Sequence, residues 1–531
     1  MYSYTLSNKI ISLIQFETVG RINKMANKIE RRHKLFVLGT IIWGIAAHGA
    51  MLFNKISCYD DLHNMFHVGA TFTSGRWMLG LLDIGVRFLF GSEQYSVPLF
   101  NGMVSFLIIA VSGCLITNLL EIKRDSSIII TSGIMVMFPV VVGIFGFMFT
   151  APFYLMGLLL STWGSFLICK NYSRLWRMAA GSLLVGCAIG IYQAWLPFAL
   201  SIMLLYFFKI TVEEVQDEWK KFLKRVIYYG FSCVLIMAFY LGFMQLSLWI
   251  LGQQLTDYKG INNFDYPGVR GYIERIILAY KEFFSPTTDQ DFLRYNMYPQ
   301  GMAVGYRVVV LLILIFSIYL VINLLSKSKR QGIQCALLLA GVPLAVNFIF
   351  VMVIRWFIYD LMMYSQIILF VFLIWLLEYV DFKKNIVYKV SLIVLIYVCV
   401  FYCRYANVCY LKAEMMQSQA TSYFTTLITR IKSLDGYTDK LPVAFINSSQ
   451  KTDANWPEIK EFEEIVIEPY TWECVINDNS WTTYMKFYCG YEPEIIEDTE
   501  VLEQNEEVAA MPLYPNEGSV KLINGVIVVK F

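Results

Sequence analysis

The densest group of chemically capable side chains lies in a short hydrophilic segment that follows the first long apolar run. It begins with two adjacent carboxylates, Asp60 and Asp61. A carboxylate within reach of a hydroxyl can remove its proton while a leaving group departs, and a neighbouring acid can orient that base or raise its pKa. Because adjacent side chains point in different directions, we expect one acid to be the base and the other its helper. The alternative is a solvated loop start in which one acid caps a helix.

Two histidines follow the acids. His63 and His67 are four residues apart and would share one face of a helix. With one of the acids they would offer ligands to a divalent metal, but the pattern lacks a helical glutamate base. We therefore favour polar lining of the loop over a metal site. Elsewhere no CxxC spacing occurs, and we expect Cys474 and Cys489 to be free thiols rather than a disulfide.

The composition is that of a membrane protein. Of 531 residues, 57% are hydrophobic and 16% are charged, and the mean hydropathy is +0.54. The net charge of +2 does not favour nucleic acid as a partner, so the lipid bilayer is the expected one. Residues 1–34 are polar and basic, and no removable signal peptide is expected. The apolar run from Leu35 is read as an uncleaved anchor.

Apolar runs long enough to cross a bilayer recur along the chain. About twenty helical residues cross the hydrocarbon core, which predicts a polytopic α-helical membrane domain over residues 35–403 with about eleven spans. The predicted spans are 35–53, 97–119, 127–148, 152–169, 178–191, 194–208, 226–250, 305–325, 333–354, 357–377 and 386–402. The fifth and sixth are short and form either a broken pair or one tilted helix.

Basic residues set the predicted orientation. Lysines and arginines cluster in the N-terminal arm, residues 1–34, and then in alternate connections between spans. The positive-inside rule places these on the cytoplasmic side of the membrane. The loops 54–96 and 251–304 and the C-terminal segment from residue 404 then lie outside.

The C-terminal segment, residues 404–531, has a soluble composition. It contains a helix-like stretch, a β-branched run at 441–446 and two alternating runs around Asn524-Gly525. Asn-Gly between such runs predicts a type I′ hairpin. We expect a small extracytoplasmic α/β domain.

Several short motifs, in their order along nearly the whole chain, resemble the serotype-converting glucosyltransferase family of phages and bacteria, membrane enzymes that decorate surface polysaccharide such as O-antigen. The resemblance implies the C-type glycosyltransferase fold and a polyprenyl-phosphate sugar donor, typically undecaprenyl phosphate glucose. It also implies a cell-surface glycan acceptor and inversion at the anomeric carbon. The motifs are Asp60-Asp61-Leu62, Gly75-Arg76-Trp77, Pro98-Leu99-Phe100-Asn101-Gly102, Phe149-Thr150-Ala151-Pro152-Phe153, Gly190-Ile191-Tyr192-Gln193-Ala194 and Met511-Pro512-Leu513-Tyr514-Pro515.

The resemblance assigns tasks to the candidate residues. Asp60 becomes the expected base and Asp61 its helper, although the two could exchange roles. A phosphate leaving group needs cations at the outer interface, and Arg76 and Arg355 are the best placed, with second-rank candidates in loop 251–304. For each arginine the alternative is contact with lipid headgroups. The remaining candidates for sugar or acceptor contact are Trp77, Tyr192, Gln193, His63 and His67.

Two other function classes fit the same outline. A flippase or transporter of lipid-linked saccharides would also place arginines and aromatic residues at the outer rim, but transporters favour ionisable residues at mid-membrane and repeated halves. A polysaccharide polymerase would not need the early pair of acids. The sequence assigns no cofactor, and a divalent metal is an alternative that it does not favour.

Overall fold

Most of the chain folds as a bundle of long apolar helices. The computed structural model describes residues 30–69, 71–170, 174–214, 218–256, 268–286, 299–353, 358–380, 386–447, 460–462, 465, 467, 469–470 and 480–531. Nine helices within these ranges are long and apolar enough to cross a membrane. They are Glu30–Phe53, α4 (Pro98–Leu120), α5 with α6 (Asp125–Gly146), α7 (Ala151–Lys170), α9 (Trp195–Glu213), α10 (Trp219–Leu251), α12 (Gln300–Lys327), η3 with α15 (Asp360–Tyr379) and α16 (Ile386–Lys432).

Two further helices occupy the other predicted spans. They are α8 (Leu175–Ile191), which is apolar but has 17 residues, and α13 (Lys329–Val346), which is followed by α14 (Ile349–Met352). The fifth and sixth predicted spans are a broken pair, because α8 ends before Tyr192 and α9 starts at Trp195. The chain is therefore a polytopic helical membrane protein, and the number of eleven spans stays a prediction.

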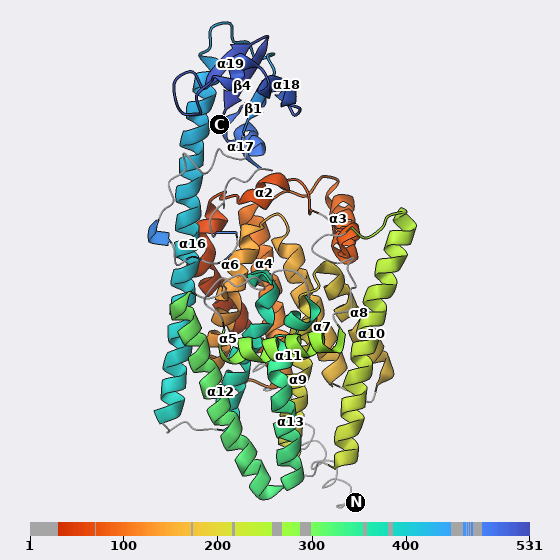
Figure 1. Cartoon of the computed structure of the whole chain (residues 1–531). Helices are drawn as coiled ribbons and strands as arrows, with labels where there is room; N and C mark the ends of the chain where they lie inside the picture. The colour runs from red at the N-terminus through yellow and green to blue at the C-terminus, as the bar shows by residue number, and fades with distance from the viewer. Residues whose placement is uncertain are drawn as a thin grey trace, which may run out of the picture.

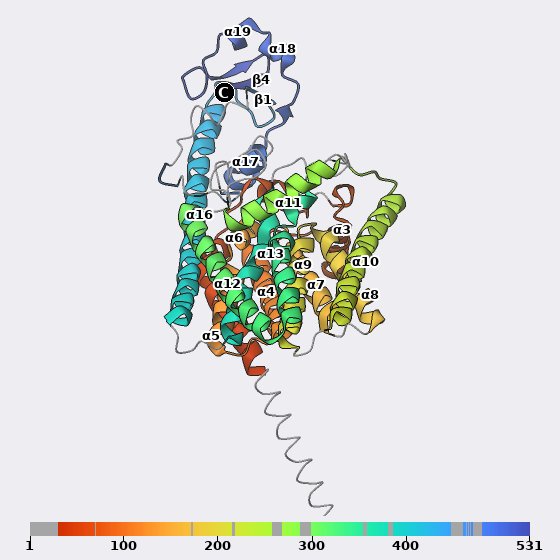
Figure 2. The same cartoon turned by 60° about the horizontal axis from the view of Figure 1, so that its bottom comes forward.

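The two ends of the bundle differ. Figure 1 shows the short helices α2 (Tyr59–His63) and α3 (Trp77–Phe90) at the same end as the C-terminal sheet, while the α12–α13 turn lies at the opposite end. The turn η1 (Phe72–Ser74) precedes α3. Both views show α11 (Gly268–Phe284) crossing the long helices instead of running along them (Figures 1 and 2). This helix is amphipathic, as expected for one that lies at an interface.

Proline breaks the helix at the centre of the bundle. Phe138 has φ −53° and ψ 135°, and Pro139 opens α6. The residue before a proline is driven out of the helical region by the proline ring, so α5 and α6 form two segments. Almost all residues of α5 and α6 are buried, so the break between them lies inside the protein.

A buried histidine ties three helices together near this break. His48 Nδ1 is 2.6 Å from the Tyr410 hydroxyl, and His48 Nε2 is 2.8 Å from the Val136 carbonyl oxygen. The histidine is fully buried. It therefore joins the helix Glu30–Phe53 to α16 and α5 with both ring nitrogens satisfied.

One continuous helix leads out of the bundle. The helix α16 has 47 residues, so the expected domain boundary at residues 403 and 404 falls within it. It ends before a four-stranded sheet with strand order β2-β1-β4-β3. The strands are β1 (Val443–Ile446), β2 (Ile495–Ile496), β3 (Val520–Ile523) and β4 (Val526–Lys530), and the short helices beside them are η5 (Lys460–Phe462), α17 (Trp481–Cys489), α18 (Glu500–Glu503) and α19 (Glu506–Ala509).

The sheet contains the hairpin that the sequence predicts. Strands β3 and β4 pair antiparallel, with Ile523 opposite Val526. The two turn residues, Asn524 and Gly525, have φ values of 49° and 80°. A type I′ turn needs positive φ at both positions, which is why Asn-Gly is favoured there.

Helices α7 and α8 approach each other closely at two glycines, and this contact leads to a stability prediction. A Cβ atom added to Gly164 on α7 would lie 2.6 Å from the carbonyl oxygen of Gly181 on α8, whereas one added to Gly230 on α10 meets nothing within 4 Å. We expect Gly164→Ala to destabilise the protein by about 1–3 kcal/mol through overpacking against backbone. Gly230→Ala should be neutral or slightly stabilising. The thermal unfolding midpoint of each variant in detergent, against wild type, checks this, and equal midpoints would contradict it.

Candidate functional site

Asp61 is a fully buried carboxylate with three hydrogen-bond donors. Lys55 Nζ lies 2.5 Å from Oδ2, and Ser96 Oγ lies 2.5 Å from Oδ1. The backbone N–H of Phe149 also donates to Oδ1, at 2.9 Å. Asp61 has no exposed surface, while the Lys55 side chain is 29% exposed. Both oxygens of this buried carboxylate thus have hydrogen-bond partners, one of them a cation.

These bonds join three segments that are distant in the sequence. Lys55 Nζ also donates to Ser96 Oγ at 2.9 Å. Asn101, one turn into α4, donates its side-chain amide to the Met148 carbonyl oxygen at 2.9 Å, beside the Phe149 N–H that Asp61 accepts. The segment after the first helix, the start of α4 and the approach to α7 are therefore held against one another. Asp61 is at the centre of this arrangement.

Asp60 is in a different environment from its neighbour. It is half-buried, and its backbone carbonyl accepts bonds from the backbone and side chain of Asn64. Successive side chains of a helix such as α2 point about 100° apart, so Asp60 does not share the buried position of Asp61. Of the two acids, Asp60 is the one that solvent reaches.

The C-terminal part of the chain contacts this network. Gln417 of α16 donates to the Lys55 carbonyl oxygen at 3.2 Å. The Tyr488 hydroxyl of α17 is 3.0 Å from Ser57 Oγ and 3.4 Å from the same Lys55 carbonyl. Burial, with a contribution from the charge of Asp61, raises the pKa of the Tyr488 phenol, so it remains neutral at physiological pH. The segment that carries the acids is thus bonded to α16 and α17.

The two histidines do not share a helical face. The helix α2 ends at His63, Asn64 caps it, and His67 follows in a bend. Both imidazoles are exposed. Among the described residues no group of three histidines, cysteines or acids is gathered as a metal site would need. The arrangement presents the histidines as polar groups on the surface beside Asp60.

Arg76 lies with Tyr192 and Gln193 in a second polar group. The Arg76 guanidinium carbon is 5.3 Å from the Tyr192 ring centroid, within the range of a cation–π contact. Gln193 donates to the Ser74 carbonyl oxygen at 3.3 Å and to the Tyr240 hydroxyl at 3.4 Å. The α8–α9 break therefore meets the η1 turn and α10.

Trp77 supports this group from inside the protein. It is 3% exposed and stacks on Phe243 of α10, with ring centroids 5.2 Å apart. Its indole also fills the space beside Gly190, where a Cβ atom would lie 2.6 Å from the ring. This burial favours a role in holding the start of α3, and with it Arg76, over direct contact with a sugar.

The two polar groups meet at the start of α7. Asp61 accepts a hydrogen bond from Phe149, two residues before this helix. Tyr154, in its first turn, packs edge-on against Tyr192 with ring centroids 4.8 Å apart. Tyr192 in turn lies under Arg76. Asp61 thus contacts the segment 149–154 directly, and Arg76 is linked to the same segment through Tyr192, at the end of the bundle that carries α2 and α3 (Figure 1).

The other predicted phosphate ligands are not brought to this place by the described residues. Arg355 lies outside the described residues, as does Arg294 of the loop 251–304. Arg270 lies in the first turn of α11 and pairs with Glu274 at 2.9 Å, with 93% of its side chain exposed. Arg76 is therefore the predicted phosphate ligand for which the structure provides a setting.

The sequence reasoning did not find Lys55, Ser96, Gln417 or Tyr488. A lysine at the end of the first span, six residues before a buried acid, is a faint local signal for the Lys55–Asp61 pair. No local sequence signal marks Ser96, Gln417 or Tyr488, because their hydrogen-bond partners lie 35 to 433 positions away in the chain.

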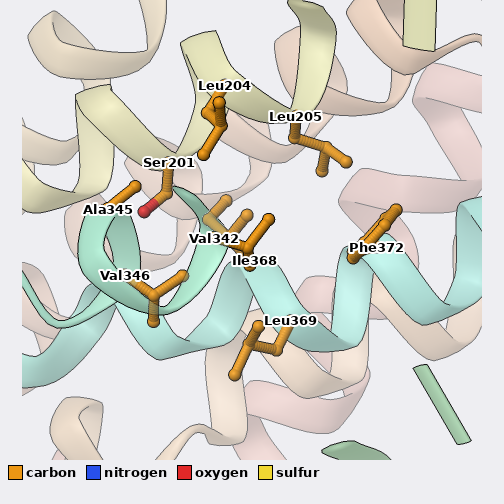
Figure 3. Close-up of a pocket in the computed structure, with 9 residues that line it drawn as sticks. All are labelled: Ser201, Leu204, Leu205, Val342, Ala345, Val346, Ile368, Leu369 and Phe372. Carbon is orange, nitrogen blue, oxygen red and sulfur yellow. The ribbon is translucent and has the colours of Figure 1, made fainter. Parts of the chain in front are cut away.

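A small apolar pocket lies elsewhere in the bundle, between α9, α13 and α15 (Figure 3). Its nine lining residues include no charged side chain, and its one hydroxyl, Ser201, donates to the Pro197 carbonyl oxygen at 2.7 Å. A phosphate or a sugar needs polar partners when it is buried, so this pocket does not suit either. The polar groups around Asp61 and Arg76 remain the candidate site.

Comparison with known proteins identifies a family for this chain. A family model described as glucosyl transferase GtrII matches residues 49–374, which is more than half of the chain and includes Asp60, Asp61, Arg76, Tyr192 and Gln193. No curated protein and no solved structure matches. The match confirms the resemblance drawn from the sequence motifs. The chain belongs to the glucosyl transferase GtrII family.

Proposed function

We propose that this membrane glucosyl transferase moves a sugar, glucose by its family, from a polyprenyl phosphate to a hydroxyl of a cell-surface glycan. The observation that carries the proposal is that Asp61, the neighbour of Asp60, and Arg76, through Tyr192, are both linked to the start of α7. A transfer from a lipid phosphate needs a base for the acceptor and a cation for the leaving group, both at the membrane surface.

Asp60 is the proposed base. The acceptor hydroxyl oxygen attacks the anomeric carbon while its proton passes to the Asp60 carboxylate. The bond between the anomeric carbon and the phosphate oxygen breaks, and its electron pair leaves with the polyprenyl phosphate. Attack from the side opposite the leaving group inverts the anomeric configuration. Asp61 does not touch the substrates in this scheme but positions α2 through its bonds to Lys55, Ser96 and Phe149.

Arg76 is the proposed phosphate ligand. A guanidinium presents several N–H donors and stays charged at the pH of any living cell, which suits a phosphate that gains charge as it leaves. Its position against Tyr192 orients it, and Gln193 and Tyr192 offer an amide and an aromatic ring to the transferred sugar. Arg355 is a second phosphate ligand in the proposal, from its predicted place at the outer end of a span.

The reaction is proposed to take place on the outer face. The start of α10 and the α12–α13 turn, which carry lysines and arginines, lie at the end of the bundle opposite α2 and α3 (Figure 1). By the positive-inside rule that end faces the cytoplasm. The candidate site and the C-terminal sheet then lie outside, where surface glycans are found. Glucosyl transferase membership favours this reaction over lipid-linked saccharide flipping.

Substitution of the two acids should separate their roles. Asp60→Asn should lower the transfer rate by about 10²–10⁴-fold, the usual worth of a general base, with an unchanged unfolding midpoint. Asp61→Asn should destabilise the protein by about 3 kcal/mol, because Lys55 loses its partner. The measurements are glucose transfer from undecaprenyl phosphate glucose and thermal unfolding, both in detergent.

A double substitution is the control for the structural role. In a cycle of Asp61→Asn and Lys55→Gln, the second change should cost little once the first is present, because the pair is already broken. Full activity in Asp60→Asn protein would contradict its assignment as base. Stability equal to wild type in Asp61→Asn protein would contradict the positioning role.

Substitution of Arg76 tests the phosphate ligand. We expect Arg76→Gln to raise the KM for undecaprenyl phosphate glucose about 10–100-fold, which is the contribution of hydrogen bonds to a charged group. Arg76→Lys keeps the positive charge, so its KM should rise less. Arg270→Gln is the matched control, since Arg270 is exposed and pairs with Glu274 on α11. A rise in KM confined to the Arg270→Gln variant would instead place the donor phosphate at α11.

A further inference from the structure

Three aromatic side chains from distant segments meet beside α2. The Phe66 ring lies edge-on to Tyr95, with centroids 5.7 Å apart, and to Phe487, with centroids 5.3 Å apart. Tyr95 is 49% exposed, Phe487 is 43% exposed and Phe66 is partly exposed. Aromatic rings usually bury most of their area, so this aromatic patch, Phe66 with Tyr95 and Phe487, leaves a considerable apolar surface open.

Two rings of the aromatic patch are anchored beside Asp61 by their sequence neighbours. Tyr95 precedes Ser96, whose hydroxyl donates to Asp61 at 2.5 Å. Phe66 follows Met65, whose carbonyl oxygen accepts a hydrogen bond from the Ser96 backbone N–H at 2.9 Å. Both rings are therefore held in a fixed relation to the loop that carries the acids.

The third ring is anchored in the same way from the C-terminal part of the chain. Phe487 precedes Tyr488, whose hydroxyl is bonded to Ser57 and to the Lys55 carbonyl. Tyr488 also stacks on Tyr484, with centroids 4.7 Å apart and the rings nearly parallel. The position of Phe487 relative to the acids is thus set by side chains of α17, and not by a free loop.

The geometry points to the aromatic patch as a docking surface for the acceptor saccharide. This inference rests on the proposed function, in which Asp60 takes the proton of an acceptor hydroxyl. An aromatic face packs against the C–H face of a pyranose ring, and the exposed His63 and His67 at α2 supply donors and acceptors for hydroxyls. A sugar held here lies next to the segment of Asp60, as the reaction requires.

A membrane lipid fits the same surface less well. Phe487 is flanked by the exposed Lys486, whose amino group lies 5.5 Å from the Phe487 ring centroid and which pairs with Glu492. Figure 1 shows α17 between the bundle and the C-terminal sheet, beside the outer part of α16. Charged pairs at this level are costly in hydrocarbon but ordinary beside a hydrated glycan.

The test measures acceptor binding apart from turnover. Oligosaccharides released from the surface polysaccharide of a strain that lacks the gene serve as the probe, titrated calorimetrically into purified full-length protein without donor. Phe487→Ala and Phe66→Ala should each weaken binding about tenfold, the upper range for an aromatic contact, while Phe487→Tyr keeps it. Phe88→Ala is the matched control, because Phe88 is an 87% exposed aromatic residue on α3, outside the patch. Its affinity should equal that of wild type.

Kinetics give the second readout. In the Phe487→Ala variant the KM for the acceptor should rise about tenfold, while the KM for undecaprenyl phosphate glucose and the rate at saturating acceptor stay within about twofold of wild type. Unchanged acceptor affinity in folded Phe487→Ala and Phe66→Ala proteins would overturn the inference. So would a loss of affinity for lipid vesicles with no loss for the oligosaccharide.

The two proposals fail in different ways. If wild type binds the oligosaccharide and the patch variants do not, but no glucose is transferred from the polyprenyl phosphate, the docking surface stands and the proposed donor is wrong. If transfer proceeds and is abolished by Asp60→Asn while the patch variants bind and react as wild type, the proposed function stands and the docking surface is wrong.

Discussion

The buried carboxylate of Asp61 is the interaction on which the candidate site depends. Its three donors come from the end of the first helix, from the residues before α4 and from the residues before α7. None of these segments has regular structure at the point of contact, so nothing in their backbones alone would fix their mutual positions. A charged group with no exposed surface is tolerated only when all its partners are in place, so the same bonds that stabilise Asp61 also specify one arrangement of the three segments.

The second polar group is built by packing instead of by an ion pair. Trp77 lies between α8 and α10, stacked on Phe243 and set against Gly190, and this contact fixes the start of α3. Arg76 immediately precedes it and meets the Tyr192 ring at the break between α8 and α9. A cation at the end of a helix bundle, beside aromatic rings and an amide, is placed where a lipid phosphate lies while its prenyl chain remains in the bilayer. In the proposed function, the group around Asp61 positions the base and the group around Arg76 binds the leaving phosphate.

How much the sequence could predict depends on how far apart in the chain the interacting residues lie. The apolar spans and the Asn524-Gly525 hairpin depend on local patterns, and the structure has helices in each predicted span and the predicted turn. The sequence named Arg76, Tyr192 and Gln193 as candidates, but their contacts join segments far apart in the chain and could not be predicted from it. The contrast between Asp60 and Asp61 could not be read, because two adjacent acids look alike until partners as far as 88 positions away bury one of them. The unbroken course of α16 was missed for a related reason: a change from apolar to polar composition indicates a change of solvent, and a helix can cross it without ending.

The long helix α16 gives the C-terminal segment a part in the site. A 47-residue helix is about 70 Å long, and it carries the last predicted span and Gln417, which bonds to the Lys55 carbonyl, on one rigid element. Tyr488 reaches the same carbonyl from α17. The C-terminal segment is therefore bonded to the loop that carries the acids at two places and is not an independent module. The region that matches the family ends at residue 374, so it includes the acids and Arg76 but not Gln417 or Phe487. In the proposed function, the base and the phosphate ligand Arg76 therefore lie inside the matched region, and part of the proposed acceptor surface lies beyond it.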